Sequence, residues 1–307
     1  MSRGLAAVTG ATGFLGQHLV RTLADAGWRV RILARRDPIS PFWQGVTPEI
    51  VIGDLDDAVA LRRLCAGADL VVHAAGLIGG RPADLHRVNV EGSRRLAEAA
   101  VSGRFLHISS LAAREPHLSA YAASKRESED VVRQILAHRA TIVRPPAIYG
   151  PGDRETLRLF VLAASSPMLP VLDPGARLAL VHAEDAAQQA VFLVNSMENG
   201  PFTLCDERPE GYLWSEIMGA AAAVFDRRAR TFRLPKAALY ALAAADGFHA
   251  DWRRGKAAFT LDKVRELTHP DWGVRPDERA LGTPGPRFDL FSGFRQTVGW
   301  YRSRGWL

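Results

Sequence analysis

The sequence predicts an α/β fold in which a doubly wound parallel sheet is followed by a smaller, mostly helical C-terminal cap. Three observations support this fold. Short apolar runs alternate with amphipathic stretches through the first half of the 307 residues, as in a parallel sheet covered by helices on both faces. Glycines cluster where the first apolar run ends. After Gly150 the alternation gives way to turns and mainly helical patterns.

Six strands are predicted in the first half, because six short apolar runs are bounded by polar residues or glycine. Runs without polar interruption are typical of parallel strands that are buried on both faces. Four stretches between the runs carry apolar residues at helical spacing and predict helices. The strands are expected at 5–10, 29–34, 48–54, 69–76, 104–110 and 140–145, and the helices at 14–27, 57–67, 83–101 and 118–139.

The second half of the chain is less regular. Turn signals follow Gly150, and a strand is then expected at 177–182 and a helix at 183–195. Residues 201–205 could form a last strand that returns to the sheet, and helical patterns dominate until a final amphipathic helix at 290–307. We therefore expect one domain around the sheet and a cap packed on it. The domain is expected to comprise residues 1–150 with about 179–205, and the cap residues 151–178 and 206–307.

The composition argues against several classes of protein. Only two cysteines occur, Cys65 and Cys205, so neither a disulfide scaffold nor a metal site is expected. The net charge is +6, but the arginines are scattered among acids. We therefore expect no nucleic-acid partner, although an anionic small molecule would suit the positive balance. The N-terminus lacks the apolar segment of a signal peptide, and the apolar run at 237–248 is too short to span a bilayer. A cytoplasmic protein without a membrane partner is expected.

Three glycines, Gly10, Gly13 and Gly16, lie between the first predicted strand and the first predicted helix. Gly10 would allow a tight turn, Gly13 a close approach of phosphate, and Gly16 close packing of the helix on the strand. At such a junction the backbone N–H groups and the positive end of the helix dipole can bind a pyrophosphate. A dinucleotide cofactor is therefore expected at this turn, with a purely structural turn as the alternative.

The spacing GxxGxxG in "TGATGFLG" resembles the opening of the extended branch of the short-chain dehydrogenase/reductase superfamily, which includes NAD(P)-dependent epimerases and dehydratases. Further segments that resemble this branch are "GDLDD" at 53–57, "VVHAAG" at 71–76, "VNVEGSRRL" at 88–96, "RPPAIYGPGD" at 144–153 and "VHAEDAA" at 181–187. The resemblance spans essentially the whole chain, and it implies a Rossmann fold with a C-terminal substrate cap. It also implies cofactor contacts from the matching positions, which are Gly10, Thr12, Gly13, Phe14, Leu15, Gly16, Asp54, Leu55, Ala74, Ala75, Gly76, Tyr121, Lys125, Pro145 and Ile148.

The end of the second predicted strand distinguishes the two nicotinamide cofactors. An acid there binds the ribose 2′-hydroxyl of NAD, whereas arginine accommodates the 2′-phosphate of NADP. This chain has Ala34 where NAD-using relatives place an acid, followed by Arg35 and Arg36. A guanidinium stays charged at any working pH and can bind phosphate through two hydrogen bonds. The cofactor is therefore predicted to be NADP(H) rather than NAD(H), and Arg35 is the better candidate of the two for the phosphate contact.

Tyr121 and Lys125 lie four residues apart in the helix predicted at 118–139, so their side chains share a face. A free phenol has a pKa of about 10, and a nearby cation is expected to lower that pKa toward the working pH. Lys125 can also hydrogen-bond the ribose hydroxyls of the nicotinamide. Ser110, at the end of the fifth predicted strand, can hydrogen-bond a substrate carbonyl oxygen, on which charge grows as hydride adds to its carbon.

This arrangement is similar to the superfamily's Ser–Tyr–Lys triad. The resemblance implies hydride transfer between NADPH and a ketone, aldehyde or secondary alcohol, with Ser110, Tyr121 and Lys125 as catalytic residues. Only ten residues separate Ser110 from Tyr121, and many sugar-nucleotide members have a longer loop there. The chain therefore looks more like dihydroflavonol reductases and hydroxysteroid dehydrogenases. A nucleotide-sugar 4-epimerase with retained cofactor is the first alternative, and a non-catalytic NADPH-binding subunit is the second.

Several other residues have a structural as well as a functional interpretation. His73 and His107 lie in apolar strands and are expected to be core residues with satisfied hydrogen bonds. Tyr149 is predicted on a loop near the mouth of the cleft, either as a substrate contact or as a surface residue. Relatives often dimerise through the helices that correspond to 82–101 and 118–138, so a homodimer is expected.

Overall fold

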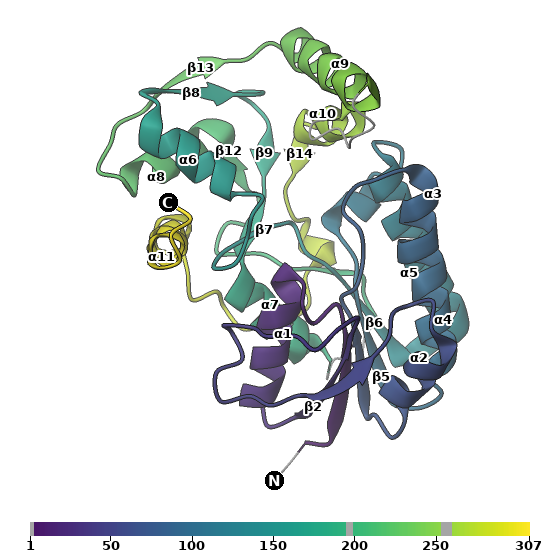
Figure 1. Ribbon diagram of the computed structural model, residues 1–307. Helices are drawn as coiled ribbons and strands as arrows, with labels where there is room; N and C mark the ends of the chain where they lie inside the picture. Colours follow the sequence, from purple (N-terminus) through teal and green to yellow (C-terminus); the bar gives the residue numbers. More distant parts are fainter. Residues whose placement is uncertain (1–2, 195–198, 253–259) are drawn as a thin grey trace.

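A sheet of seven strands in the order β11-β6-β5-β4-β1-β2-β3 forms the centre of the first half of the protein (Figure 1). The structure, a computed structural model, describes residues 3–194, 199–252 and 260–307, with the backbone alone for 246–252. All strand pairs in this sheet are parallel, which confirms the predicted doubly wound sheet. Its strands are β1 (Leu5–Thr9), β2 (Arg29–Ala34), β3 (Glu49–Ile52), β4 (Leu70–His73), β5 (Arg104–Ile108), β6 (Ala140–Arg144) and β11 (Phe202–Thr203).

The strand order reverses at β1, which lies between β4 and β2. Val8 of β1 is paired in register with Ile32 of β2, and Thr9 of β1 is paired with His73 of β4. In open parallel sheets a ligand binds beyond the carboxyl ends of the strands at such a reversal. The glycine turn that follows β1 therefore lies where this fold binds its ligands.

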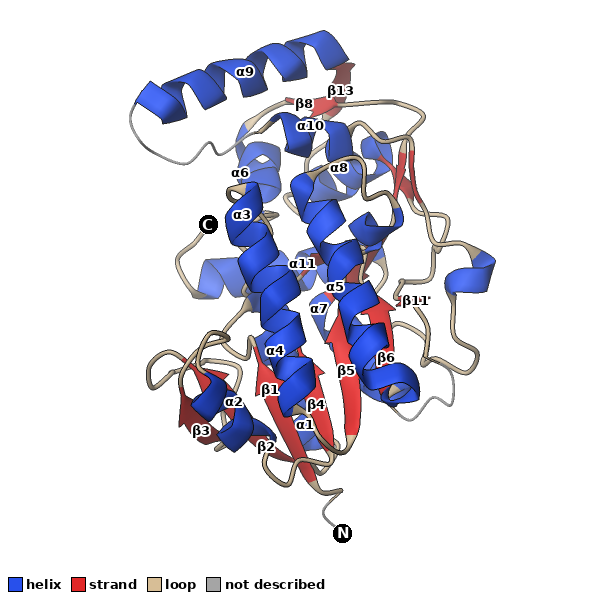
Figure 2. Cartoon of the chain, turned by 90° about the vertical axis from the view of Figure 1, so that its right-hand side faces the viewer, coloured by secondary structure: helices blue, strands red, loops and turns tan. Residues whose placement is uncertain are grey.

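Helices cover both faces of the sheet (Figure 2). α1 (Phe14–Asp25) and α7 (Ala183–Leu193) contact each other on one face. The other face is covered by α2 (Ala58–Cys65), α4 (Gly92–Ala99) and α5 (Ala120–Leu136). The sheet is therefore enclosed on both sides, as the uninterrupted apolar strands predict.

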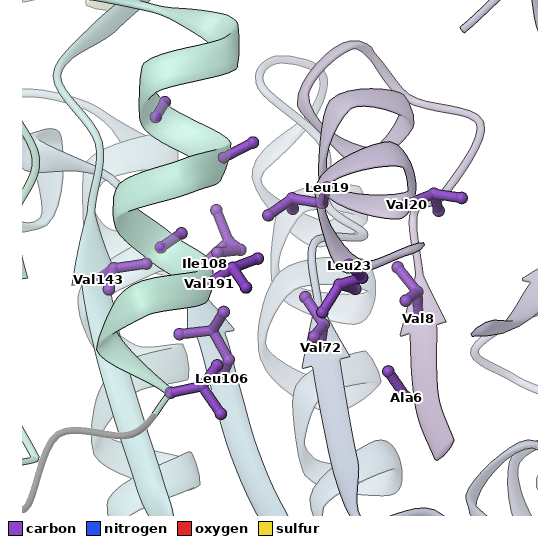
Figure 3. Packing of buried hydrophobic residues seen from close by; sticks show 14 of the residues in the cluster. Ala6, Val8, Leu19, Val20, Leu23, Val72, Leu106, Ile108, Val143 and Val191 are labelled. Atoms are coloured by element: carbon purple, nitrogen blue, oxygen red, sulfur yellow. The ribbon is translucent and has the colours of Figure 1, made fainter. Parts of the chain in front are cut away.

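The central strands of the sheet contribute side chains to two separate apolar cores. In β1, Ala6 and Val8 belong to the core that includes Leu19 of α1 and Val191 of α7, and Figure 3 shows these residues packed together. Ala7, between them, belongs to the core on the opposite face. Because successive side chains of a strand point to opposite faces, burial of both faces requires apolar residues at every position.

Two predicted elements are interrupted in the structure. The helix expected at 83–101 consists of α3 (Pro82–Leu85), a π-helical segment η1 (His86–Glu91) and α4. The strand expected at 177–182 breaks at Ala179 into β9 (Arg177–Leu178) and β10 (Leu180–His182). β9 pairs with Tyr212–Leu213 and Asp271–Trp272, whereas β10 pairs with Ala147–Tyr149, so the strand divides where its partners change.

The second half of the chain forms a cap beyond the carboxyl edge of the sheet (Figure 1). Its main core contains the buried rings of Tyr149, Phe160, Phe294 and Tyr301. The helices are α6 (Leu157–Ser165), α8 (Trp214–Ala223), α9 (Lys236–Trp252), α10 (Leu261–Leu267) and α11 (Leu290–Ser303). Short strands connect them, which are β7 (Ala147–Tyr149), β8 (Met168–Val171), β12 (Tyr212–Leu213), β13 (Arg230–Arg233) and β14 (Asp271–Trp272). The predicted helical character is present, but strands of two to four residues are too short for apolar periodicity to predict.

Candidate active site

The turn after β1 depends on its glycines. Gly10 has a φ of 71°, and a Cβ there would lie 2.5 Å from backbone atoms of Ala74 and Ala75, so this turn packs directly on the turn after β4. A Cβ at Gly16 would collide with the carbonyl oxygen of Gly10. Gly13 is the N-cap of α1 and provides no side-chain hydrogen bond to the helix. The first N–H groups of α1 therefore have no side-chain cap, which fits the binding of a pyrophosphate.

The other predicted cofactor residues lie near the same edge of the sheet. Asp54 follows β3 and is exposed, and its Oδ1 accepts a hydrogen bond from the Asp56 N–H (2.9 Å). The carbonyl oxygen of Pro145, after β6, accepts from the Leu111 N–H (2.9 Å). The remaining residues of this set are exposed or partly buried: Thr12, Phe14, Leu15, Leu55, Gly76 and Ile148. Together with the glycine turn, these positions fit a dinucleotide that crosses the carboxyl edge of the sheet.

Arg35 and Arg36 directly follow β2, and both are exposed. Neither forms an ion pair within the described part of the chain, whereas Arg31 of the same strand pairs with Glu49 (2.9 Å). Their guanidinium groups are therefore accessible cations at the end of the strand where a ribose phosphate is expected.

Ser110 and Tyr121 are brought together at the end of β5. Ser110 is the N-cap of the short helix η2 (Leu111–Arg114), and Tyr121 lies in the first turn of α5. The Ser110 side chain lies close enough to the Tyr121 phenol to influence its pKa. Lys125 lies one helical turn further along α5, where its buried Nζ donates to the carbonyl oxygen of Ile108 (2.8 Å). The structure thus brings the three predicted catalytic side chains close to one another. They lie beside the loop that follows β4, since Lys125 Nζ is 3.5 Å from the position that a Cβ would take on Gly76 of this loop.

The pKa values of Tyr121 and Lys125 are set mainly by burial. Burial raises the pKa of Tyr121 to about 12; the nearby Ser110 side chain opposes this rise and the Glu266 carboxylate adds to it. Burial also lowers the pKa of Lys125 to about 8, although Glu129 favours its charged form. The predicted lowering of the Tyr121 pKa by Lys125 is therefore wrong, since the lysine is directed to Ile108 and desolvation of the phenol dominates. The phenol remains protonated near neutral pH and can act as a proton donor.

A buried ion pair that the sequence analysis missed supports this triad. Glu129 is completely buried and accepts two hydrogen bonds from Arg144, Nε to Oε1 at 2.8 Å and Nη2 to Oε2 at 2.7 Å. Ser109 also donates its hydroxyl to Glu129 Oε1 (2.5 Å). The pair therefore joins α5 to the ends of β5 and β6. Its signal in the sequence is the spacing of Glu129, which lies four residues after Lys125 on the same helical face.

Asn89, in the π-helical segment η1, holds the loop after β4. Its Oδ1 accepts from the Leu77 N–H (2.8 Å), and its Nδ2 donates to the Leu77 carbonyl oxygen and to Ser124 Oγ, both at 2.9 Å. Ser124 is the residue before Lys125 in α5. One amide side chain therefore holds together the loop after β4 and the helix α5.

The cap is anchored to the segment between Ser110 and Tyr121. Arg114 donates to the carbonyl oxygens of Gly273 and Asp271, each at 2.7 Å. At the start of α5, Asp262 of α10 accepts from the Ala120 N–H (2.9 Å), and Glu266 of α10 accepts from the Ser119 hydroxyl. The sequence analysis missed these contacts because their partners lie more than a hundred residues apart.

Three residues for which the sequence suggested either a structural or a functional role are packed in the interior of the protein. His73 is hydrogen-bonded to Thr9 Oγ1 (2.7 Å) and Ser93 Oγ (2.9 Å), and burial lowers its pKa to about 3. His107 is buried and contacts Ser128 Oγ (3.0 Å). Tyr149 is fully buried in the cap core, so the interpretation as a substrate contact or surface residue is wrong. The interpretation as a core residue with satisfied hydrogen bonds is confirmed for His73. His107 is also a core residue, but its buried Nδ1 has no hydrogen-bond partner among the described residues, so the expectation that its hydrogen bonds are satisfied is wrong.

Comparison with known proteins identifies related sequences and folds. The model of the "NAD dependent epimerase/dehydratase family" matches residues 6–203. The chain is similar to a "Ceramide reductase" of Caulobacter vibrioides (strain NA1000 / CB15N), with 50% identity over 309 residues that cover 100% of this chain and 97% of that protein. This similarity extends through the cap as well as the sheet.

Two solved structures share the fold. The crystal structure of gox2253 superposes with a TM-score of 0.78 at 22% identity and covers 99% of both chains. UDP-N-acetylglucosamine 4-epimerase from Bacillus cereus superposes with a TM-score of 0.71 at 17% identity and covers 97% of this chain and 96% of that one. At this level of identity the two structures establish the fold and not the substrate.

Proposed function

The chain belongs to the NAD-dependent epimerase/dehydratase family within the extended short-chain dehydrogenase/reductase superfamily, and it is an oxidoreductase. We propose that it is an NADP-dependent reductase that converts a ketone group of a ceramide-class lipid into a secondary alcohol. The observation that carries the proposal is the placement of Ser110 beside Tyr121, with the buried Lys125 one helical turn away. The similarity to a protein named as a ceramide reductase supports the choice of substrate class.

The residues of the site would divide the reduction among them. When bound, the nicotinamide cofactor supplies the hydride that adds to the carbonyl carbon. Ser110 holds the carbonyl oxygen by a hydrogen bond that strengthens as negative charge develops there. Tyr121 donates its phenolic proton to that oxygen, which completes the alcohol. Lys125 would hydrogen-bond the nicotinamide ribose, and Tyr121 would then regain a proton from solvent.

Arg35 is proposed to bind the 2′-phosphate that distinguishes NADPH from NADH. Arg35→Ala is expected to raise the Kd for NADPH by about 10- to 100-fold, because a hydrogen bond between two charged groups is lost. The Kd for NADH is expected to stay within about twofold, since NADH lacks that phosphate. Fluorescence titration with both cofactors measures the two constants.

The matched control is Arg29→Ala, which removes an exposed arginine from the other end of the same strand. It should leave both dissociation constants unchanged. Equal affinities of the wild-type protein for NADPH and NADH would contradict the assignment of the cofactor.

The pKa of Lys125 predicts an alkaline limit to activity. Since burial lowers that pKa to about 8, the ammonium is charged below this pH and neutral above it. Tyr121, with a pKa of about 12, keeps its proton throughout. The kcat/KM for NADPH, which reports ionisations of the free enzyme, is therefore expected to fall about tenfold per pH unit above the lysine pKa. Lys125→Met should have low activity that no longer falls in this range, and persistence of the same decline in the variant would contradict the assignment.

A turnover assay with matched substrates tests the proposed reaction. NADPH consumption is expected with the keto form of a ceramide dispersed in detergent, together with formation of the alcohol by mass spectrometry. Cofactor that stays bound through purification, with epimerised sugar nucleotide and no net NADPH consumption, would instead support the 4-epimerase. A failure to consume NADPH with any carbonyl compound would support a non-catalytic NADPH-binding subunit.

Two further assignments remain predictions. Residues 151–178 and 206–307 are proposed to form the substrate-binding cap, because their contacts at Arg114 and Ser119 lie next to the catalytic side chains. The exposed parts of α3, α4 and α5 are proposed as the surface of a homodimer. Sedimentation velocity measures the oligomeric state directly.

A further inference from the structure

The outer face of the cap combines positive charge with exposed apolar side chains. We name it the outer cap surface and define it by Arg228, Arg230, Phe232, Arg233, Tyr240 and Leu242, which lie on β13, on the segment before it and on α9. All six are exposed. Figures 1 and 2 show β13 and α9 at the end of the molecule opposite the N-terminus.

The charge of this surface has one sign. Residues 227–245 contain five basic residues and no acidic one. Lys236 pairs with Asp173 (3.1 Å), and Arg227 donates to the Ala164 carbonyl oxygen. Arg228, Arg230 and Arg233 form no ion pair within the described part of the chain, although Arg233 lies close enough to Asp173 to help lower the pKa of that carboxyl. Arg228 and Arg230 are therefore exposed guanidinium groups without an ion-pair partner among the described residues. They lie close together in a sequence whose other arginines appear scattered.

The apolar part of the surface is unusual for a helix that faces solvent. The inner side of α9 is buried through Leu239 and Ala243, which pack with Val264 of α10. Tyr240 (38% exposed) and Leu242 (56% exposed) flank this buried stripe on its two sides, and residues 237–245 include no charged side chain. Phe232 of the neighbouring strand is 40% exposed. Because this part of α9 exposes apolar side chains without any charge among them, we expect an apolar partner to cover it.

We propose that the outer cap surface binds an anionic lipid bilayer. Basic residues interleaved with apolar and aromatic side chains are typical of segments that lie in the membrane interface, where arginines contact anionic head groups and apolar side chains enter the acyl boundary. No helix within residues 3–194, 199–252 and 260–307 is suited to crossing a membrane, so the protein would lie on the bilayer. This differs from the expectation of no membrane partner, which considered only membrane-spanning segments.

The role of this binding rests on the proposed function. A ceramide-class substrate is a membrane lipid, and a cap that rests on the bilayer would receive it without passage through water. α9 packs on α10, and α10 contacts the start of α5 through Asp262 and Glu266. The membrane-facing surface and the catalytic helix are therefore connected through a single packed element.

Sedimentation with lipid vesicles tests the proposal. The full-length protein should sediment with vesicles that contain phosphatidylglycerol, and much less with vesicles of phosphatidylcholine alone. The triple variant Arg228→Glu/Arg230→Glu/Arg233→Glu should lower the partition coefficient by at least about tenfold. The variant Phe232→Ser/Leu242→Ser keeps the charge and should also weaken binding. The matched control Arg29→Glu/Arg62→Glu/Arg63→Glu makes the same change in net charge on exposed arginines at β2 and α2, and it should bind as the wild type does.

Several results would overturn the proposal. One is equal loss of binding in both triple variants, and another is equal binding of the wild type to neutral and anionic vesicles. A third is self-association of the wild type in the absence of vesicles that the Arg228→Glu/Arg230→Glu/Arg233→Glu variant abolishes. That result would show that the outer cap surface binds a second copy of the chain. NADPH turnover on detergent-dispersed substrate, measured in parallel, separates the two hypotheses. Turnover without vesicle binding contradicts the membrane surface alone, and vesicle binding without turnover contradicts the proposed reaction alone.

Discussion

Replacing Tyr121 by phenylalanine is expected to lower kcat for carbonyl reduction by about 10²- to 10⁴-fold, the usual contribution of a positioned general acid. The substitution removes only the phenolic hydroxyl, which lies beside Ser110. The ring should keep its packing, so the Kd for NADPH and the thermal unfolding midpoint are expected to change little. Single-turnover measurements with saturating NADPH isolate the chemical step from cofactor binding.

Tyr149→Phe is the matched control for this experiment. Tyr149 is a buried tyrosine whose hydroxyl makes one long hydrogen bond, to the Asp289 carbonyl oxygen at 3.4 Å. Its replacement should leave kcat within about twofold of the wild type, since it removes a single weak contact of a side chain packed in the cap core. A Tyr121→Phe enzyme with full activity on its substrate would contradict the proposed mechanism.

Replacing Glu129 by alanine is expected to lower the free energy of unfolding by about 3–5 kcal/mol. The reason is that Arg144 would keep its buried charge without the carboxylate that now accepts its two hydrogen bonds. Ser109 would also lose its acceptor. Chemical denaturation followed by tryptophan fluorescence measures the change.

Glu127→Ala provides the comparison, because Glu127 lies on the same helix but is half exposed and contacts only His86 (3.3 Å). It should change the free energy of unfolding by no more than about 0.5 kcal/mol. If Glu129→Ala were equally mild, Glu129 and Arg144 would not form the ion pair described above. Glu129 also favours the charged form of Lys125, so its loss should move the alkaline limit of activity to lower pH.

The fold was largely predictable because its signals are local. The strands β1, β4, β5 and β6 are buried along almost their whole length and appear as mainly apolar runs. The glycine turn is likewise confined to a few adjacent residues, where Gly10 and Gly16 meet backbone atoms too closely for any side chain. The break at Ala179 was not predictable, since β9 and β10 pair with different strands that are distant in the sequence.

The sequence was sufficient to predict which side chains meet at the candidate site, but it was not sufficient to predict their pKa values. Ser110, Tyr121 and Lys125 could be placed together from strand order and helical spacing. The pKa of Tyr121 could not, because it depends on how completely tertiary packing excludes water from the phenol. The acids of α10 were also inaccessible to sequence reasoning, since 142 and 147 residues separate them from their partners at the start of α5.

The position of Glu266 links substrate choice to proton donation. This carboxylate belongs to α10 of the cap, yet its negative charge contributes to the raised pKa of Tyr121. A cap remodelled to accept a different substrate would therefore also retune the acidity of the group that protonates the product. Members of the family that diverge in this helix should differ in the pH at which they work as well as in what they reduce.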